Sequence, residues 1–417
     1  MNMKHQNKQE QKQKQKNKQK QVYKNAASQN SQLKVALVHD YLREYGGAER
    51  VLEALHEIFP TAEVFVSFVD SSVTGIHWEK FKDWNITQSW LTKIPFYKKL
   101  FSPLRIFAPN YFSAFDLSGY DLVISSTNAY FSKAVTVRTL DTNGKQKQAI
   151  HVSYCHTPAR SLYGYTTMTN WKSNPVIKFF GTLINHYLRI VDVAVARNNV
   201  DLFIANSQET KRRIQKFYKL NSEVIYPPIE VAKDKVFPSG KQFVSKNGYF
   251  LVVGRIAASK HVDLAVQTAT HHALPLKVVG SGKGLEYLQS IAGSTVEFLE
   301  NVDDQKLSQL YEQATALLYP AEDEDFGMVP IEAMGHGIPV IAHRSGGPLE
   351  TVKVGETGYF FDEFTVASLS GAIEKVMNTQ WDKQKIYEYA QTFSKDRFKT
   401  EILETVSKVL KSKNIKR

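Results

Sequence analysis

Two glutamates, Glu324 and Glu332, stand eight positions apart in the stretch 320–340, PAEDEDFGMVPIEAMGHGIPV. The pair Phe326-Gly327 predicts a flexible loop between them, and the residues 329–334 predict a helix. One carboxylate should therefore lie in a loop and the other inside a helix. Backbone amides of such a loop can bind phosphate or sugar oxygens, and Glu332 can accept hydrogen bonds from the two hydroxyls of a ribose.

Two positive side chains flank a second predicted strand-to-helix turn. Arg255 and Lys260 lie near the two ends of the run 254–260, GRIAASK. A forked guanidinium and a compact ammonium can hold a diphosphate between them. The glycine-rich residues 280–284, GSGKG, follow the next predicted strand and favour an anion site at the same edge. The acidic triplet 323–325 could instead bind a divalent metal through oxygen ligands. Because Arg255 and Lys260 already supply positive charge, we expect no metal.

Gly46 and Gly47 follow the first predicted strand and open a helix. Two glycines at a helix N-terminus let backbone N–H groups approach an anion, which the helix dipole also favours. The pair is not a GxGxxG motif, and a plain tight turn explains it as well. A phosphate contact here is therefore one of two interpretations.

His156 follows the predicted strand 148–154 in the run CHTPAR and should project toward a ligand cleft. A histidine there can donate a hydrogen bond to a substrate hydroxyl or stabilise developing charge. The alternative is a buried histidine bound to a neighbouring carbonyl group. A Cys155/His156 nucleophile is not expected, because adjacent positions of a strand face opposite sides of the sheet.

Alternating apolar runs and helical stretches must position these residues, and they predict two α/β units. The first unit contains strands at 33–38, 62–68, 120–126, 148–154, 202–205 and 223–226. The second contains strands at 249–253, 276–280, 295–299, 315–319, 339–342 and 358–361. Tyr226-Pro227-Pro228 and the polar stretch 230–248 separate them. Two parallel sheets covered by helices leave a cleft between the carboxyl edges of their strands.

The formal charge of +12 first suggests nucleic acid as a partner. Residues 1–32 carry eight lysines and one acid, so most of this charge lies in a Lys/Gln-rich tract and not in a binding groove. Low complexity predicts a disordered tail there, with a basic arm as the alternative. Cys155 is the single cysteine, which excludes an intramolecular disulfide. We expect no nucleic-acid partner and a reducing compartment.

Two further segments bear on membranes. Residues 90–112 mix Lys93, Lys98, Lys99 and Arg105 with aromatic residues, which fits either an anionic membrane surface or an ordinary basic-aromatic core edge. The predicted helix 175–195 is apolar at helical spacing, and we expect it to pack against the sheet. No run reaches the roughly 18 apolar residues that a membrane-spanning helix needs.

Together these motifs resemble the retaining glycosyltransferases of family 4, in particular their mannosyltransferase-like branch, with the two-domain GT-B fold. EDFGMVPIE is similar to the family's E-x7-E signature, within the longer match PAEDEDFG…EAMGHGIPVIAHRSGGPLE. GRIAASKHVDLAV, VVGSGKG, FIANSQETKRRI and VALVHDYLREYGGAERVLEAL extend the resemblance over nearly everything from Leu33 onward. His336 departs from the small residues usual after the second glutamate, and no role for it follows from the sequence.

The resemblance implies roles for the matching residues. The implied catalytic positions are His156 near the donor sugar, Arg255 and Lys260 on the departing diphosphate, and Glu324 on hydroxyls of the transferred sugar. The implied donor-binding positions are Gly46, Gly47, Asn206, Gly280, Gly282, Phe326, Gly327, Met328, Val329 and Glu332. Cations aimed at a leaving diphosphate stabilise the transition state more than the ground state, so no metal is required. Front-face transfer with retention leaves Glu324 without a covalent role.

The resemblance also implies a domain plan of two Rossmann-like domains facing across a cleft. Its parts are a tail (1–32), an acceptor-side domain (33–228), a linker (229–248), a nucleotide-sugar-binding domain (249–381) and a C-terminal helix at about 382–417 that returns to the first domain.

The implied activity is transfer of a hexose from a nucleotide-diphosphate sugar to a saccharide or prenyl-diphosphate-linked acceptor, in polysaccharide or glycolipid biosynthesis. The HTPAR run and the YPP linker look most like members that use GDP-mannose, with a UDP-hexose as the other donor. The implied location is cytoplasmic and peripheral to the inner face of the membrane. The alternatives are a non-catalytic binding protein on the same scaffold, and a phosphorylase or nucleotide-sugar epimerase.

Overall fold

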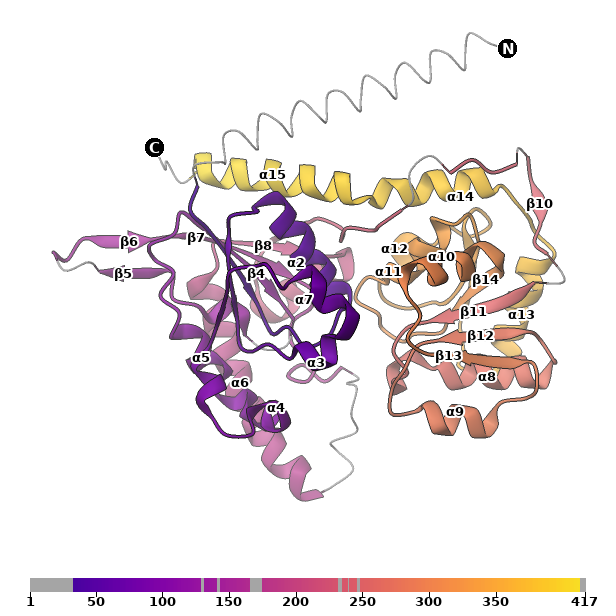
Figure 1. The fold of residues 1–417 in the computed structure, drawn as a ribbon, viewed down its shortest axis with the longest axis horizontal. Coiled ribbons are helices and arrows are strands. Elements are labelled where there is room, and N and C mark those ends of the chain that lie inside the picture. Colours follow the sequence, from indigo (N-terminus) through magenta and orange to yellow (C-terminus); the bar gives the residue numbers. More distant parts are fainter. Residues whose placement is uncertain are drawn as a thin grey trace, which may run out of the picture.

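The protein forms two α/β domains, seen side by side in Figure 1. The computed structural model describes residues 33–412 apart from 129–130, 141–142, 166–174, 232–234, 239 and 246–247. The expected tail 1–32 and the last residues, 413–417, lie outside the described residues. Several positions of the expected linker also lie outside them.

The first sheet has seven parallel strands in the order β3-β2-β1-β4-β7-β8-β9. They are β1 (Val35–His39), β2 (Glu63–Val66), β3 (Ile86–Gln88), β4 (Leu122–Thr127), β7 (Ile150–Cys155), β8 (Leu202–Ala205) and β9 (Ser222–Val224). Neighbouring residues of β1 enter different cores, Leu37 on one face and Val38 on the other. Both faces are therefore covered, which explains why the strands are continuous apolar runs. Only β3, three residues long and without such a run, was not predicted.

The second sheet has six parallel strands in the order β13-β12-β11-β14-β15-β16. They are β11 (Tyr249–Val253), β12 (Leu276–Val279), β13 (Val296–Leu299), β14 (Ala314–Tyr319), β15 (Val340–His343) and β16 (Gly358–Phe361). All six confirm the predicted strands. Its helices are α8 (Val262–His271), α9 (Leu285–Ile291), α10 (Asp304–Gln313), α11 (Met328–Met334), α12 (Pro348–Thr351) and α13 (Val366–Met377).

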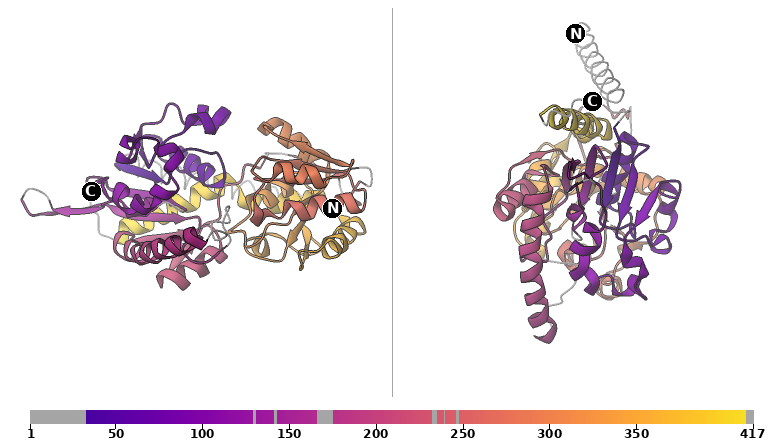
Figure 2. Two further views of the ribbon diagram at one scale, coloured as in Figure 1. Left: turned by 90° about the horizontal axis from the view of Figure 1, so that it is seen from below. Right: turned by 90° about the vertical axis from the view of Figure 1, so that its left-hand side faces the viewer.

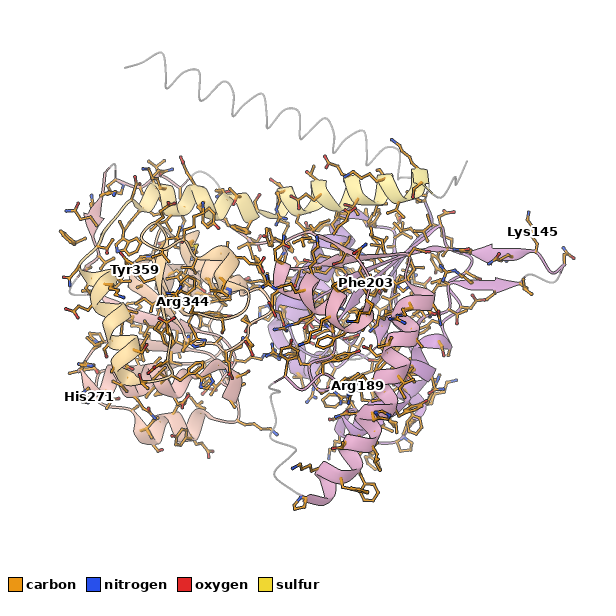
Figure 3. All side chains as sticks on the ribbon, turned by 180° about the vertical axis from the view of Figure 1, so that it is seen from behind. Lys145, Arg189, Phe203, His271, Arg344 and Tyr359 are labelled. Carbon is orange, nitrogen blue, oxygen red and sulfur yellow. The ribbon has the colours of Figure 1, made fainter. Side chains whose placement is uncertain are left out.

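The first domain carries the helices α2 (Gly47–Ile58), α3 (Ser71–Thr74), α4 (Tyr97–Leu100), α5 (Ala108–Ser113), α6 (Pro175–Asn199) and α7 (Gln208–Tyr218). Two antiparallel pairs lie outside the main sheets: β5 (Arg138–Leu140) with β6 (Gln146–Gln148), and β10 (Gln242–Phe243) with β17 (Gln380–Trp381). The first pair projects from the domain, with Lys145 near its tip (Figure 3). Neither pair was predicted, since short polar strands carry little apolar pattern.

Helix α6 corrects one expectation. Its second half packs as expected, with Leu188 and Ala196 buried. Its first half extends past the lower end of the domain (Figures 1 and 2), and six large apolar side chains there are exposed. They are Phe179, Phe180, Leu183, Ile184, Tyr187 and Ile190. The expectation that the whole helix packs against the sheet is therefore wrong for this half, because the helix is longer than the sheet that it covers.

The C-terminal segment joins both domains along the top of Figure 1. Helix α14 (Lys383–Ala390) contributes Ile386 to the second core, and α15 (Lys395–Ser412) contributes Phe398 to the first. Where the chain crosses between them, Ile229 forms a parallel bridge with Ser394. The two segments that pass between the domains are therefore paired with each other. The domain limits given above remain a prediction.

The strand order reverses beside the first strand of each sheet, between β1 and β4 and between β11 and β14. Open α/β sheets bind ligands outside the carboxyl ends of their strands at such a point. The predicted loops after β11 and β14 lie there. The GT-B fold therefore places the candidate residues of the second domain at the edge from which ion pairs cross to the first domain.

Candidate active site

The loop and helix predicted around the two glutamates are confirmed. Glu324 lies in the loop that follows β14, and Glu332 lies inside α11. Gly327 caps this helix with φ of +84°, a left-handed conformation that a glycine adopts at little cost. The first carboxylate is partly exposed and the second is nearly buried.

Lys260 is bound to Glu324. The lysine lies in the short turn Ala258–Lys260 after β11, and its Nζ donates to Oε2 of the glutamate. Burial acts to raise the pKa of Glu324, but Lys260, with smaller contributions from Arg160 and Arg255, holds that pKa below its ordinary value. The carboxylate is therefore ionised at neutral pH, and it fixes the ammonium at the mouth of the site.

Arg255, the second expected diphosphate ligand, reaches the other domain. Its Nη1 donates to Oε2 of Glu44 at 2.7 Å, while its side chain stays 56% exposed. Lys260 and Arg255 thus lie at one strand edge but are bound to different carboxylates. Such an exposed ion pair contributes little to stability, so an anionic ligand can replace Glu44 at small cost.

Glu332 is bound from the first domain by Arg50, which lies on α2 just after Gly47. Arg50 Nη1 donates to Oε1 of Glu332, and Tyr311 Oη donates to Oε2 at 3.3 Å. The charge of Glu332 raises the pKa of the Arg50 guanidinium, against the effect of burial. Sequence reasoning missed Arg50, because the contact joins residues 282 positions apart.

His336 now has a structural role. Its ring lies against Tyr311, with centroids 5.0 Å apart. Nδ1 is 2.9 Å from the carbonyl oxygen of Glu332, and Nε2 is 2.9 Å from Oγ of Ser308. The histidine therefore ties the end of α11 to α10 and packs against Tyr311, one of the two partners of Glu332.

Gly46 and Gly47 lie where the domains meet. The N–H of Gly46 donates to Oε2 of Glu49 at 2.8 Å, and Gly47, the first residue of α2, is exposed. A Cβ on Gly47 would stand 2.8 Å from Sδ of Met328 on the second domain. Close approach of the domains is thus one physical reason for this glycine, in addition to the expected phosphate contact.

Gly280 and Gly282 have a packing reason as well. A Cβ on Gly280 would lie 1.9 Å from the carbonyl oxygen of Gly254, and one on Gly282 would lie 2.2 Å from that of Ile256. These are backbone contacts that cannot shift cheaply. The loops after β11 and β12 therefore pack against each other only with glycine at both positions.

Two glycines that sequence reasoning did not single out support the Glu324 loop. A Cβ on Gly346 would lie 2.2 Å from the carbonyl oxygen of Glu324, and one on Gly347 would lie 2.3 Å from the backbone of Phe326. The N–H of Gly347 also donates to the carbonyl oxygen of Glu324 at 2.6 Å. The run SGG after a predicted strand was the signal available.

The remaining residues that were predicted to bind the donor differ in the groups that they can offer to it. Phe326 is buried and stacks on Tyr226, with centroids 5.4 Å apart, so only its backbone can face a donor. Asn206 is buried, and its Oδ1 accepts from Oγ of Ser207. The residues at the start of α11, Met328 and Val329, are half-buried.

A second set of cross-domain contacts holds the Glu324 loop. Arg213 on α7, only 2% exposed, donates through Nη1 to Oδ1 of Asp325. Arg160, four residues after His156, donates to the carbonyl oxygen of Asp323 at 3.0 Å. The loop that carries Glu324 is therefore held by two arginines of the first domain, neither of which was singled out from the sequence.

His156 follows the carboxyl end of β7, as predicted. It is 8% exposed, and burial lowers its pKa to about 4, so the ring is neutral at physiological pH. The thiol of Cys155 is 1% exposed, and burial raises its pKa to about 12. A protonated, buried thiol is a poor nucleophile, which agrees with the expectation that Cys155 has no catalytic role.

The Asp323-Glu324-Asp325 triplet does not form a metal site in this geometry. Within the part of the chain that the structure describes, no group of three or more His, Cys, Asp or Glu side chains converges in a way that could hold a metal ion. The carboxylates of Glu324 and Asp325 are instead bound by Lys260 and by the two arginines, and the backbone N–H of Asp323 donates to Oγ of Ser345.

Two family models match adjoining parts of this chain. A family model described as Glycosyltransferase Family 4 matches residues 45–233, and one described as Glycosyl transferases group 1 matches residues 235–393. The chain belongs to glycosyltransferase family 4. The family predicted from the motifs is thus confirmed, and the two matches meet at residues 233–235, within the expected linker.

Two of the curated relatives of this family 4 chain are named mannosyltransferases. The alpha-1,3/1,6-mannosyltransferase ALG2 of Homo sapiens is 28% identical over 211 residues, which cover 42% of this chain and 49% of that protein. ALG2 of Dictyostelium discoideum is 25% identical over 326 residues, 68% of this chain and 73% of that protein. The chain spans between 26% and 49% of the length of the first three curated relatives that it matches.

Solved structures share the fold of this family 4 chain. Anabaena Alr3699/HepE in complex with UDP and glucose has a TM-score of 0.62 at 19% identity, covering 90% of this chain and 99% of that one. The lipopolysaccharide outer core galactosyltransferase WaaB has a TM-score of 0.61 at 19% identity, covering 90% and 100%. These similarities confirm the GT-B fold.

Proposed function

We propose that this protein is a retaining hexosyltransferase that uses a nucleotide-diphosphate sugar, with mannose favoured, and builds a polysaccharide or glycolipid precursor. The observation that carries the proposal is the Lys260–Glu324 pair at the strand edge of the second domain, with Arg255 and Arg50 beside it. The acceptor would be a saccharide or a prenyl-diphosphate-linked sugar.

The geometry supports a division of labour in the transfer step. The bond between the anomeric carbon and the diphosphate oxygen breaks as the sugar becomes oxocarbenium-like, and the leaving diphosphate gains negative charge. A hydroxyl oxygen of the acceptor bonds to the anomeric carbon on the same face, and the proton of that hydroxyl passes to the departing diphosphate. Lys260 and Arg255 stabilise that charge more in the transition state than in the ground state. Glu324 holds Lys260 in place and accepts hydrogen bonds from hydroxyls of the transferred sugar. In this proposal no metal takes part.

The comparisons and two sequence runs support the proposed class of donor. The HepE structure contains UDP and glucose, and the ALG2 relatives are named mannosyltransferases. The HTPAR run and the YPP linker of this chain favour GDP-mannose over a UDP-hexose. Turnover of a panel of GDP- and UDP-sugars by the purified protein tests the donor. Robust use of UDP-glucose with none of GDP-mannose would refute the mannosyl assignment, and the anomeric configuration of the product tests retention.

The competing function is a non-catalytic nucleotide-sugar or membrane-surface binding protein on the same scaffold. Replacement of Lys260 or Glu324 by Ala should lower kcat by about 10²- to 10³-fold and leave the fold intact. Full activity in both variants would reject the proposed site, whereas donor binding without turnover in the native protein would favour the binding protein. Product analysis with and without acceptor separates a phosphorylase or an epimerase.

We further propose that the protein works at an anionic membrane surface on the cytoplasmic side. In the segment 90–112, Phe96, Leu100 and Phe107 are exposed, whereas Tyr111 and Phe112 are buried, so the segment is both a core edge and an apolar surface. The exposed half of α6 reaches the same lower end of the domain (Figures 1 and 2).

Charge favours lipid as the occupant of this surface. Lys178, His186 and Arg189 are exposed on α6, and no acidic residue occurs from 175 to 191. Figure 3 labels Arg189 on this helix. Exposed apolar side chains interleaved with cations are typical of a helix at an anionic interface. No helix in the described part of the chain is long and apolar enough to cross a bilayer.

Vesicle sedimentation tests this surface. Native protein should partition onto phosphatidylglycerol vesicles and not onto phosphatidylcholine vesicles. At about 1 kcal/mol for each basic residue near an anionic surface, replacing both Lys178 and Arg189 by Gln should weaken partitioning about 30-fold. A matched control replaces Lys277 and Arg344, two cations of the second domain, by Gln. Equal partitioning of all three proteins would refute the assignment.

A further inference from the structure

Four buried side chains form a hydrogen-bonded chain that ends at His156. Nε2 of His156 lies 2.8 Å from Oγ of Ser126, which lies 3.0 Å from Nδ1 of His39. Nε2 of His39 lies 3.4 Å from Oε1 of Glu49. His156 directly follows β7, and the other three residues lie on β4, β1 and α2, at the point where the strand order of the first sheet reverses. All four are at most 8% exposed.

Glu49 sets the donor-to-acceptor direction of this hydrogen-bonded chain. Burial acts to raise its pKa, but the His39 ring and the N–H of Gly46 outweigh that effect and hold the pKa below its ordinary value. An ionised carboxylate only accepts hydrogen bonds, so Nε2–H of His39 donates to it. When His39 carries its one ring proton on Nε2, its Nδ1 accepts from the hydroxyl of Ser126. Oγ of Ser126 in turn accepts from Nε2–H of His156.

We propose that Ser126, His39 and Glu49 are positioning residues that fix the ring of His156, place its proton on Nε2 and leave Nδ1 as a hydrogen-bond acceptor. The role in transfer rests on the proposed function. Under it, His156 accepts a hydrogen bond from a hydroxyl of the bound sugar through Nδ1. This reverses the donor role that the sequence alone suggested for the histidine.

The main chain supports this arrangement independently of the rings. The N–H of His156 donates to the carbonyl oxygen of Thr127 at 2.9 Å. The hydroxyl of Thr210 on α7 donates to the carbonyl oxygen of His156 at 3.1 Å. Among the described residues, Nδ1 of His156 has no protein partner at hydrogen-bond distance, so this ring nitrogen remains for a ligand.

A second histidine of the same strand provides a matched comparison. His151 on β7 is 0% exposed, and its Nε2 lies 2.8 Å from Oγ of Ser125, the neighbour of Ser126 on β4. Its Nδ1 lies 2.9 Å from the carbonyl oxygen of Asn199. Both ring nitrogens of His151 thus end on protein groups, as expected for a histidine with a packing role. The Ser125–His151 pair has the same chemistry as the Ser126–His156 pair, but both ring nitrogens of His151 have protein partners.

This pairing gives a controlled experiment. Ser126→Ala and Ser125→Ala each remove one buried hydroxyl from one buried histidine, so both should lower thermal stability by similar amounts. Only Ser126→Ala should lower kcat, by about 10- to 100-fold, as is typical when an outer partner that orients a histidine is removed, with KM for the donor little changed. Ser126→Thr, which keeps the hydroxyl, should retain most of the activity. Equal kcat in the two alanine variants would overturn the proposal.

The tautomer can be read without any activity. In native protein labelled with ¹⁵N-histidine, the ring signals of His156, identified by their loss in His156→Gln, should show a protonated Nε2 and a bare Nδ1. Glu49→Gln, whose amide can both donate and accept, should remove that preference. A proton on Nδ1 in the native protein would overturn the proposed direction. Because this measurement needs no turnover, an inactive protein with the expected tautomer refutes the proposed function and not the positioning.

Discussion

Replacing Lys260 by Ala removes the ammonium that is proposed to face the leaving diphosphate. In the unliganded protein the same change leaves Glu324 without its bound partner. The two side chains are about equally exposed, at 24% and 23%, so the pair is shielded enough to matter and open enough for a ligand to reach it. One substitution therefore tests both transfer and the ionisation of Glu324.

The expected magnitude follows from the two roles. Loss of one preorganised charge at a developing anion costs about 10²- to 10³-fold in kcat, or about 2.7–4 kcal/mol. Loss of a hydrogen bond to a charged group costs about 1.5–3 kcal/mol of unfolding free energy. Since Arg255 remains at the same strand edge, transfer should fall toward the lower end of the first range.

The pH dependence has a definite sign. Lys260 keeps the pKa of Glu324 below its ordinary value of 4.5 in the folded protein, so the pair stabilises the fold fully above that value. This contribution is lost as the pH falls through the lowered pKa. The stability difference between native protein and Lys260→Ala should therefore be largest near neutral pH and shrink below about pH 4.5.

The assays are initial-rate kinetics with the donor that the native protein uses, and urea unfolding at several pH values. Lys277→Ala is the matched control, since Lys277 pairs with Glu297 at 3.1 Å in the same domain and its side chain is 28% exposed. The control should keep native kcat. If Lys260→Ala also kept native kcat, or if its stability deficit grew as the pH fell, the assignment of the Lys260–Glu324 pair would be refuted.

Three further predictions concern contacts that hold the site together. Asp325→Ala should cost about 2–3 kcal/mol of unfolding free energy, because it removes a charged partner of the buried Arg213; urea unfolding checks this, and a loss below 0.5 kcal/mol, as is usual for a surface change, would contradict it. Arg50→Met should change the donor KM with little effect on kcat, since Arg50 touches Glu332 and not the expected reacting groups; a selective fall in kcat would argue otherwise. Gly280→Ala should destabilise by more than about 1 kcal/mol, because its Cβ would meet a backbone oxygen at 1.9 Å; an unchanged melting temperature would contradict the loop packing.

Elements and loops could be predicted from the sequence because their signals are local. The runs VALV (35–38) and YFLVV (249–253) are apolar throughout and β-branched in part, a pattern that is typical of strands buried on both faces. Gly327, followed by a predicted helix, indicated that the loop with Glu324 ends before the helix with Glu332 begins. Helix α6 was misjudged because apolar spacing shows which face is apolar but not where the sheet beneath it ends.

The partners of the site residues could not be predicted, because most of them come from the other domain. Arg50 with Glu332, and Arg213 with Asp325, join residues 282 and 112 positions apart, and no local pattern encodes such a pairing. Ser126 illustrates the same limit at shorter range. In the sequence it is one of two adjacent serines in a strand, and only the pleat decides which hydroxyl faces His156.

These cross-domain pairs also hold the cations of the site in place. Arg255 is held by Glu44 and Arg50 by Glu332, each pair linking the two domains, whereas Lys260 and Glu324 belong to one domain. An entering diphosphate can therefore take Arg255 from an exposed carboxylate without disturbing the Lys260–Glu324 pair. The exchange replaces one anion by another at the same guanidinium, so donor binding need not separate the domains.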